Sequence, residues 1–230
     1  AHSVFQGNVS VNADATTGTG GALQMNSGTV NIVHSVFVKN EAGGIADDGG
    51  GALMVYGGTI TCTNVTMLDN ETQSTGKPDA NGISISAGTT CHFRNSIAWG
   101  AGAQVHNLGT FNNNHSLVRG TGTALPNLDL DPQFADAGNP VGPDGIWGTA
   151  DDGLQLTPCS PAANMGNNAY VTLTSDFAGG VRILETVVDM GAYELQSPVT
   201  PLDFTDMVKT YGDPDAPMPN FTSCSGLPVT

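Results

Sequence analysis

The sequence predicts an all-β solenoid, in which short strands stack as parallel rungs, and three observations support this fold class. Related residues return in steps of 30 positions, as in Leu23, Leu53 and Ile83. Within each repeat the apolar residues recur at every second position, which is the period of a strand. Glycine pairs such as Gly50-Gly51 interrupt these runs and mark sharp bends. Because one such unit cannot bury its apolar face alone, the units must stack.

The repeats align in columns that set the expected register. The columns are Leu23, Leu53, Ile83; Met25, Val55, Ile85; Gly28, Gly58, Gly88; Thr29, Thr59, Thr89; and, after one inserted residue, Val30, Ile60, Cys91 and Ile32, Cys62, Phe93. Rungs stacked about 4.8 Å apart would bring each column into contact with itself and pair the strand backbones. The sequence therefore predicts a parallel β-helix over residues 1–118.

A column of His2, His34, Asn64 and Asn95 follows these strands at the predicted bend. Histidine in a repeated position suggests acid–base or metal chemistry. In this column, however, histidine and asparagine alternate as if either side chain served. We therefore favour a structural role, in which these side chains hydrogen-bond to neighbouring rungs, with catalysis as the alternative.

Three segments break the repeat at the same point of each rung, at residues 8–19, 39–49 and 70–80. They carry the polar residues Asn8, Asp14, Asn40, Glu41, Asp47, Asp48, Asn70, Glu71 and Asp79. Equivalent insertions in a solenoid stack on one side and often form its binding face. Two interpretations stay open, a contact surface or solvated loops without a ligand.

The chain has 21 acidic and 6 basic residues and a formal net charge of −15. This balance disfavours nucleic acid and anionic membrane surfaces as partners. No apolar run approaches the roughly 18 residues of a membrane span, so we expect no membrane insertion. Residues 1–8 match residues 33–40, the second half of a rung. The sequence thus predicts an open first rung that is capped or paired with another chain.

The four cysteines form two groups of different character. Cys62 and Cys91 lie in neighbouring rungs but two residues out of register, which separates their Cα atoms by about 8 Å. That distance is too long for a disulfide, so we expect two buried free thiols. Cys159 lies in turn-rich sequence and Cys224 in the tail, and we expect a disulfide between them in an oxidising compartment.

Four ordered motifs occur in the second half of the chain. They are Asn-Leu-Asp-Leu-Asp-Pro-Gln-Phe at 127–134, Leu-Thr-Pro-Cys-Ser-Pro-Ala at 156–162, Asp-Phe-Ala-Gly-Gly-Val-Arg at 176–182 and Val-Asp-Met-Gly-Ala-Tyr-Glu at 188–194. With Asn-Ser-Ile-Ala-Trp-Gly at 95–100, they resemble the closing region of bacterial surface β-helix proteins of the "choice-of-anchor" type. The resemblance covers residues 1–195 and implies a right-handed parallel β-helix that is secreted or displayed on a bacterial surface. It implies no catalytic residues, and Cys159 stands where the family pattern has a glycine.

Two polar groups of residues stand out in this closing region. Arg182, Asp189 and Glu194 look like a structural ion-pair cluster that ties the final turn to the body. A second group, Asp144, Asp151 and Asp152, lies in the acidic loop 142–153 and offers oxygen ligands for calcium. Asx-turns that cap backbone groups explain the same aspartates without a metal, and both interpretations stay open.

The sequence divides into rungs at 1–118, a closing region and irregular cap at 119–195, and a tail at 196–230. In the tail, Phe204, Met207, Val208 and Tyr211 have the spacing of one helix face, which predicts a single short helix. Its apolar face is expected to dock on the last rung or on a neighbouring molecule. A proline-stiffened, extended segment is expected after it.

Three functional hypotheses fit these features. The first is a non-enzymatic structural or adhesive module of the bacterial exterior, which self-assembles head to tail when the first rung accepts a strand from another copy. The second is a carbohydrate-active lyase or hydrolase, which needs a cation with a base or two carboxylates at a fixed separation, and no such pair recurs in the repeats. The third is a glycan-binding or protein-binding module, for which exposed aromatic platforms are few. We favour the first because it uses every feature.

Overall fold

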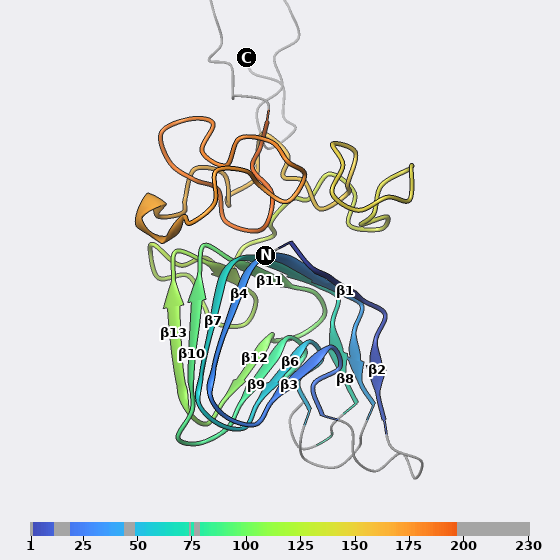
Figure 1. Cartoon of the computed structure of the whole chain (residues 1–230), viewed down its shortest axis with the longest axis vertical. Helices are drawn as coiled ribbons and strands as arrows, with labels where there is room; N and C mark the ends of the chain where they lie inside the picture. The colour runs from blue at the N-terminus through green and yellow to red at the C-terminus, as the bar shows by residue number, and fades with distance from the viewer. Residues whose placement is uncertain (1, 12–18, 44–48, 74, 76–78, 197–230) are drawn as a thin grey trace, which may run out of the picture.

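The computed structural model describes residues 2–11, 19–43, 49–73, 75 and 79–196. Within these residues the protein is all-β, with three parallel sheets and one 3-10 turn, η1 (Asn168–Tyr170). The parallel sheets agree with the stacked repeats that the sequence predicts (Figure 1). The predicted tail helix, at residues 203–212, lies outside the described residues.

Each sheet collects one side of the successive repeats. The largest contains β1 (Val4–Gln6), β4 (Thr29–Val38), β7 (Thr59–Leu68), β10 (Thr90–Arg94), β11 (Ile97–Trp99), β13 (Thr110–Asn114) and β14 (Leu117–Val118). The second contains β3 (Leu23–Met25), β6 (Leu53–Val55), β9 (Ile83–Ile85) and β12 (Val105–Asn107). The third contains β2 (Val9–Ser10), β5 (Glu41–Ala42) and β8 (Glu71–Thr72). One rung therefore contributes one strand to each sheet in turn. For example, β3, β4 and β5 together form one rung.

The strand register confirms the interior columns. Leu53 pairs with Leu23 and Ile83, and a common core buries these columns. The column of Thr29, Thr59 and Thr89 is wrong at its last member, because Thr29 pairs with Thr59 as predicted but Thr90, and not Thr89, pairs with Thr59 on the other side. The extra residue lies in the turn before Thr89, so that Thr90 N–H bonds to the oxygen of Gly58 at 3.0 Å. After Arg94, β12 and β13 complete another rung within the predicted stack of residues 1–118.

Each rung turns at a corner where the backbone adopts a positive φ angle. This corner column consists of His2, His34, Asn64, Asn95 and His115, with φ angles of 50°, 46°, 53°, 45° and 50°. Asparagine, aspartate and histidine are the side chains that tolerate this left-handed conformation best, which is the property that the column shares. The hydrogen bonding expected of this column is not seen at His34, because neither ring nitrogen has a partner within the described residues. Its ring stacks instead on His2, with centroids 5.6 Å apart.

The three inserted segments begin differently from their predicted loops. Their first residues form the third sheet, and Asn8, Asn40 and Asn70 make an asparagine ladder along it. The Nδ2 of Asn40 donates to Asn70 Oδ1 at 2.8 Å, and the Nδ2 of Asn8 donates to Asn40 Oδ1 at 2.8 Å. Asn40 and Asn70 are buried, so these amides belong to the fold and not to a binding face. Asp14, Asp47 and Asp48, which were expected to lie in the same face, fall outside the described residues.

The closing segment, residues 119–196, lies along the side of the stack (Figure 1). Its side chains Leu154, Phe177 and Tyr193 cover the outward-facing Val36 and Leu68. Its backbone also reaches the rungs, since Ala192 N–H donates to Thr66 Oγ1 at 2.9 Å. The segments after the corner in β4 and β7, residues 35–38 and 65–68, are therefore buried on both faces. The irregular cap predicted at residues 119–195 thus covers the side of the stack, where these outward-facing side chains are apolar.

The asparagine ladder generates a stability prediction. Replacing Asn40 with alanine removes the acceptor of two hydrogen bonds from Asn8 and the donor to Phe5 O and Asn70 Oδ1. Because buried groups are left unpaired, Asn40→Ala should lower the free energy of unfolding by about 2–4 kcal/mol. Urea denaturation followed by circular dichroism measures this. The matched control is Asn31→Ala in the exposed part of β4, which should cost less than about 0.5 kcal/mol.

Candidate functional site

Polar groups converge where the closing segment meets the corner column. Gly191 N–H donates to the backbone oxygen of Asn95 at 2.8 Å. The Asn95 side chain donates to Asn167 O at 3.0 Å and accepts from Asn167 N–H at 2.8 Å. Two rungs closer to the N-terminus, the buried His34 lies within electrostatic reach of Arg182. This interface is the candidate site, because it concentrates the buried titratable groups of the protein's described part.

Arg182 is the buried cation of the interface, with 1 % of its surface exposed. Its Nη2 donates to the backbone oxygens of Asp189 at 2.9 Å and Gly191 at 2.8 Å. Its Nη1 lies 3.5 Å from Oε2 of Glu194. The structure thus brings Arg182, Asp189 and Glu194 together, and Arg182 touches Asp189 through the backbone oxygen.

The carboxylates around Arg182 accept backbone hydrogen bonds from distant turns. Asp189 accepts from Asn164 N–H at 2.6 Å and Leu195 N–H at 2.7 Å. Glu194 accepts from the N–H groups of Leu184 at 3.2 Å and Asp189 at 3.0 Å. These hydrogen bonds to Asp189 and Glu194 therefore hold several turns of the closing segment to one another.

Asp176 joins this cluster, although sequence reasoning did not single it out. It accepts from Gly180 N–H at 2.7 Å and from Glu194 N–H at 2.9 Å. The sequence signal that could have identified Asp176 is the Gly-Gly pair at 179–180 that follows it, because an aspartate shortly before glycines is typical of a turn.

Burial dominates the electrostatics of this cluster. Burial and the nearby Asp189 raise the pKa of Glu194 to about 7, while Arg182 opposes the change. Burial also raises the pKa of Asp189, although backbone N–H groups counteract it. One guanidinium thus serves several carboxyl groups that would repel one another if all were ionised.

His34 is the base on the stack side of the interface. Burial, together with the positive charge of Arg182 and the neighbouring His2, lowers its pKa to about 3. The ring is fully buried. His34 is therefore a neutral packing group at physiological pH and not a proton shuttle.

Asp152 does not face the other two residues of the predicted calcium loop. Its Oδ2 accepts from Tyr193 Oη at 2.8 Å and from Gly148 N–H at 2.8 Å. Burial raises the pKa of Asp152 and, together with this hydrogen bond, that of Tyr193. This buried pair anchors the loop 142–153 to the body, a role that the sequence did not indicate.

Asp144 and Asp151 make the short-range hydrogen bonds that the metal-free interpretation describes. Asp144 Oδ1 accepts from Ile146 N–H at 2.7 Å, and Asp151 Oδ2 accepts from Asp144 N–H at 3.2 Å. Among the described residues there is no group of three His, Cys, Asp or Glu side chains arranged to hold a metal ion. Calcium binding stays a prediction, which calorimetric titration with calcium tests directly.

Within the described residues, the cysteines divide as predicted into buried free thiols and a disulfide-bonded cysteine. Cys62 and Cys91 are free and buried, as expected from their register, and burial raises the pKa of both thiols. Cys159 is disulfide-bonded. Cys224 lies outside the described residues, so its pairing with Cys159 stays a prediction.

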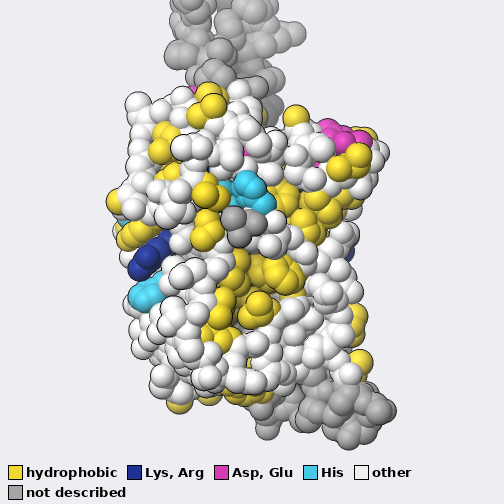
Figure 2. All heavy atoms as spheres, in the orientation of Figure 1, with side chains coloured by type: hydrophobic (Ala, Val, Ile, Leu, Met, Phe, Trp, Pro, Cys, Tyr) yellow, Lys and Arg dark blue, Asp and Glu magenta, His cyan; other side chains and the backbone are white. Residues whose placement is uncertain are grey.

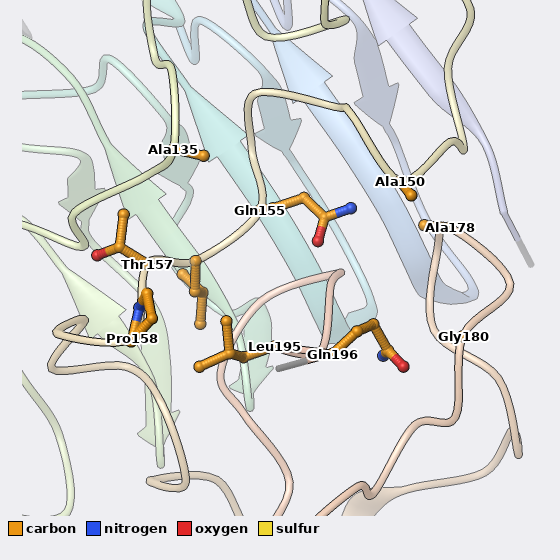
Figure 3. Close-up of a pocket in the computed structure, with 10 residues that line it drawn as sticks. Ala135, Ala150, Gln155, Thr157, Pro158, Ala178, Gly180, Leu195 and Gln196 are labelled. Atoms are coloured by element: carbon orange, nitrogen blue, oxygen red, sulfur yellow. The ribbon is translucent and has the colours of Figure 1, made fainter. Parts of the chain in front are cut away.

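A hollow of about 520 Å³ lies within the closing segment (Figure 3). Alanine, leucine, proline and glycine line most of it, and its polar side chains are Gln155, Thr157 and Gln196. None of its lining residues is an acid, a base or a cysteine. The hollow therefore offers shape and amide hydrogen bonds but no proton-transfer group.

Comparisons with known proteins do not place the chain in a family. No family model matches it, and a search of curated proteins finds no match. Within the described residues no helix has the length and apolar character needed to cross a bilayer.

The buried imidazole generates a pH prediction. Because the folded state holds the pKa of His34 near 3, below the ordinary 6.5, its contribution to stability is complete above pH 6.5 and is lost as pH falls toward 3. His34→Asn, which inserts the residue found at the next two corners, should remove up to about 1.4 kcal/mol per pH unit from the acid slope. The difference in unfolding free energy between variant and wild type, measured from pH 7 to 4, isolates this effect. An unchanged slope would contradict it.

The buried cation generates a second prediction. Arg182→Met leaves the surrounding carboxylates without their counter-ion and should cost about 3–5 kcal/mol of unfolding free energy at pH 8. The cost should shrink on acidification, because protonated carboxyl groups need no cation. Thermal denaturation at pH 8 and pH 5 tests both statements. Arg119→Met is the control, since Arg119 is exposed and lies over the ring of Trp99, an interaction worth about 1 kcal/mol.

Proposed function

We propose that this protein is a non-enzymatic structural or adhesive module of a bacterial surface or secreted protein. In this proposal its rungs wind as a right-handed parallel β-helix of the "choice-of-anchor" type. Support for the winding comes from in-register parallel strands joined by one-turn crossovers, which are right-handed in almost all proteins. The four ordered sequence motifs support the family.

One observation carries the functional proposal: five carboxylates of the closing segment are occupied by the protein's own backbone. Asp129, Asp136, Asp176, Asp189 and Glu194 each accept at least two backbone N–H hydrogen bonds. A glycoside hydrolase instead needs two carboxyl groups free to face a substrate. The acidic residues of this chain thus support a role in holding irregular backbone on a stack of strands.

An extracellular location is part of the proposal. The disulfide at Cys159 supports it, because disulfides persist mainly in oxidising compartments. Buried free thiols at Cys62 and Cys91 are compatible with it, since burial shields them from oxidants. Antibody labelling and protease shaving of intact source cells test this location.

The functional proposal predicts no turnover of polysaccharides. Purified protein incubated with pectin, alginate and xylan, with calcium present, should release neither reducing ends nor unsaturated products. A characterised polysaccharide lyase serves as the positive control. Product formation that disappears in a variant of this chain would establish the carbohydrate-active alternative, and binding without products on a glycan array would establish the glycan-binding one.

A further inference from the structure

Residues 189–195 form a short strap that attaches the closing segment to the stack. In the middle of this strap, Gly191 N–H donates to Asn95 O at 2.8 Å and Ala192 N–H donates to Thr66 Oγ1 at 2.9 Å. Gly191 has a φ angle of 98°, and a Cβ atom there would lie 2.9 Å from Thr66 Oγ1. Only glycine fits so close an approach, so the strap is seated directly on the rungs.

Both ends of the strap carry buried carboxyl groups, those of Asp189 and Glu194. A third buried carboxyl group, that of Asp176, accepts from Glu194 N–H at 2.9 Å. The facing cation is Arg182, whose Nη2 is bonded to two backbone oxygens and whose Nη1 lies 3.5 Å from Glu194 without a hydrogen bond. If all three carboxyl groups were ionised, one guanidinium would leave two negative charges uncompensated away from water, and such a cluster gains from binding a proton.

The hydrogen-bond lengths identify Glu194 as the group that binds this proton. The N–H···O distances are 2.6 and 2.7 Å at Asp189, and 2.7 and 2.9 Å at Asp176. At Glu194 they are longer, at 3.2 and 3.0 Å. Because hydrogen bonds to a carboxylate favour its ionised form, Glu194 is the least stabilised anion of the three. Its pKa of about 7, raised chiefly by burial, agrees with this assignment.

The other titratable groups around the strap do not supply a second cation. His34 of β4 lies within electrostatic reach of Arg182 but is neutral at physiological pH. Three further side chains near the cluster are acids or a phenol and bring no positive charge: Glu185, Asp152 and Tyr193. Within the described part of the chain, the charge on Glu194 is therefore balanced by Arg182 or by a proton.

We propose that residues 189–195 are a pH-operated strap, closed on the stack while Glu194 carries a proton and opened when Glu194 ionises. Opening breaks the hydrogen bonds of Gly191 and Ala192 to the rungs and uncovers outward apolar side chains such as Leu68. Figure 2 shows apolar side chains on both sides of the boundary between the closing segment and the rungs. This device goes beyond the structural role proposed above and does not depend on it.

The direction of the pH effect follows from linkage. In the closed strap the pKa of Glu194 is about 7, above the ordinary 4.5. The closed state therefore has its full advantage below pH 4.5 and loses it as pH rises through 7. Between pH 6 and pH 8 the Glu194 contribution to strap protection should fall about tenfold.

Hydrogen–deuterium exchange read by mass spectrometry measures this protection, after correction for the intrinsic exchange rate. Relative to Glu194→Gln, which cannot ionise, the wild-type strap should lose about tenfold protection from pH 6 to pH 8. Glu71→Gln, at an exposed position of β8, is the control and should behave as the wild type does. At pH 8 the wild-type strap should also exchange faster than β7, since the strap opens without the stack.

A wild-type strap that follows the same pH dependence as Glu194→Gln overturns the proposal. So does equal protection of the strap and β7 at pH 8, because only the whole fold would then open. Circular dichroism checks that each variant folds. If Glu194→Gln does not fold, a carbon-13 NMR titration of the wild-type Glu194 carboxyl group decides, and a midpoint near the ordinary 4.5 overturns the proposal. The polysaccharide assays test the proposed function separately.

Discussion

The hydrogen-bonded register between successive rungs is the constraint on which the rest of the structure depends. The asparagine ladder holds this register because its amides link successive rungs: the Nδ2 of Asn40 donates both to Asn70 Oδ1 in the next rung and to the backbone oxygen of Phe5 in the preceding one. A slip of one residue would turn every core side chain outward. It would also place a β-branched residue such as Val33 at the corner, where the backbone needs a positive φ angle.

Burial on both faces of one sheet follows from this register. The strand segments after the corner column turn apolar side chains such as Val36 and Leu68 outward, so they need a cover. The closing segment supplies that cover but contains almost no regular structure, and its backbone groups need partners. Carboxylates such as Asp176 and Asp189 provide these partners, and Arg182 offsets the negative charge that they bring inside.

Ten of the chain's 21 acidic residues lie in the closing segment. Five of them accept at least two backbone N–H hydrogen bonds each, so part of the acidic character of the chain has a structural origin: Asp129, Asp136, Asp176, Asp189 and Glu194.

The sequence by itself determined the repeat, the parallel stacking and the interior columns, because strand alternation and a 30-residue step are local patterns that leave few ways to bury Leu23, Leu53 and Ile83. It also determined that Cys62 and Cys91 are free, since register alone separates them. Only the tertiary structure decided that the closing segment covers the side of the stack, that Asp152 turns toward Tyr193, and that His34 is neutral beside Arg182. These features depend on contacts between residues far apart in the chain, and no local period encodes them.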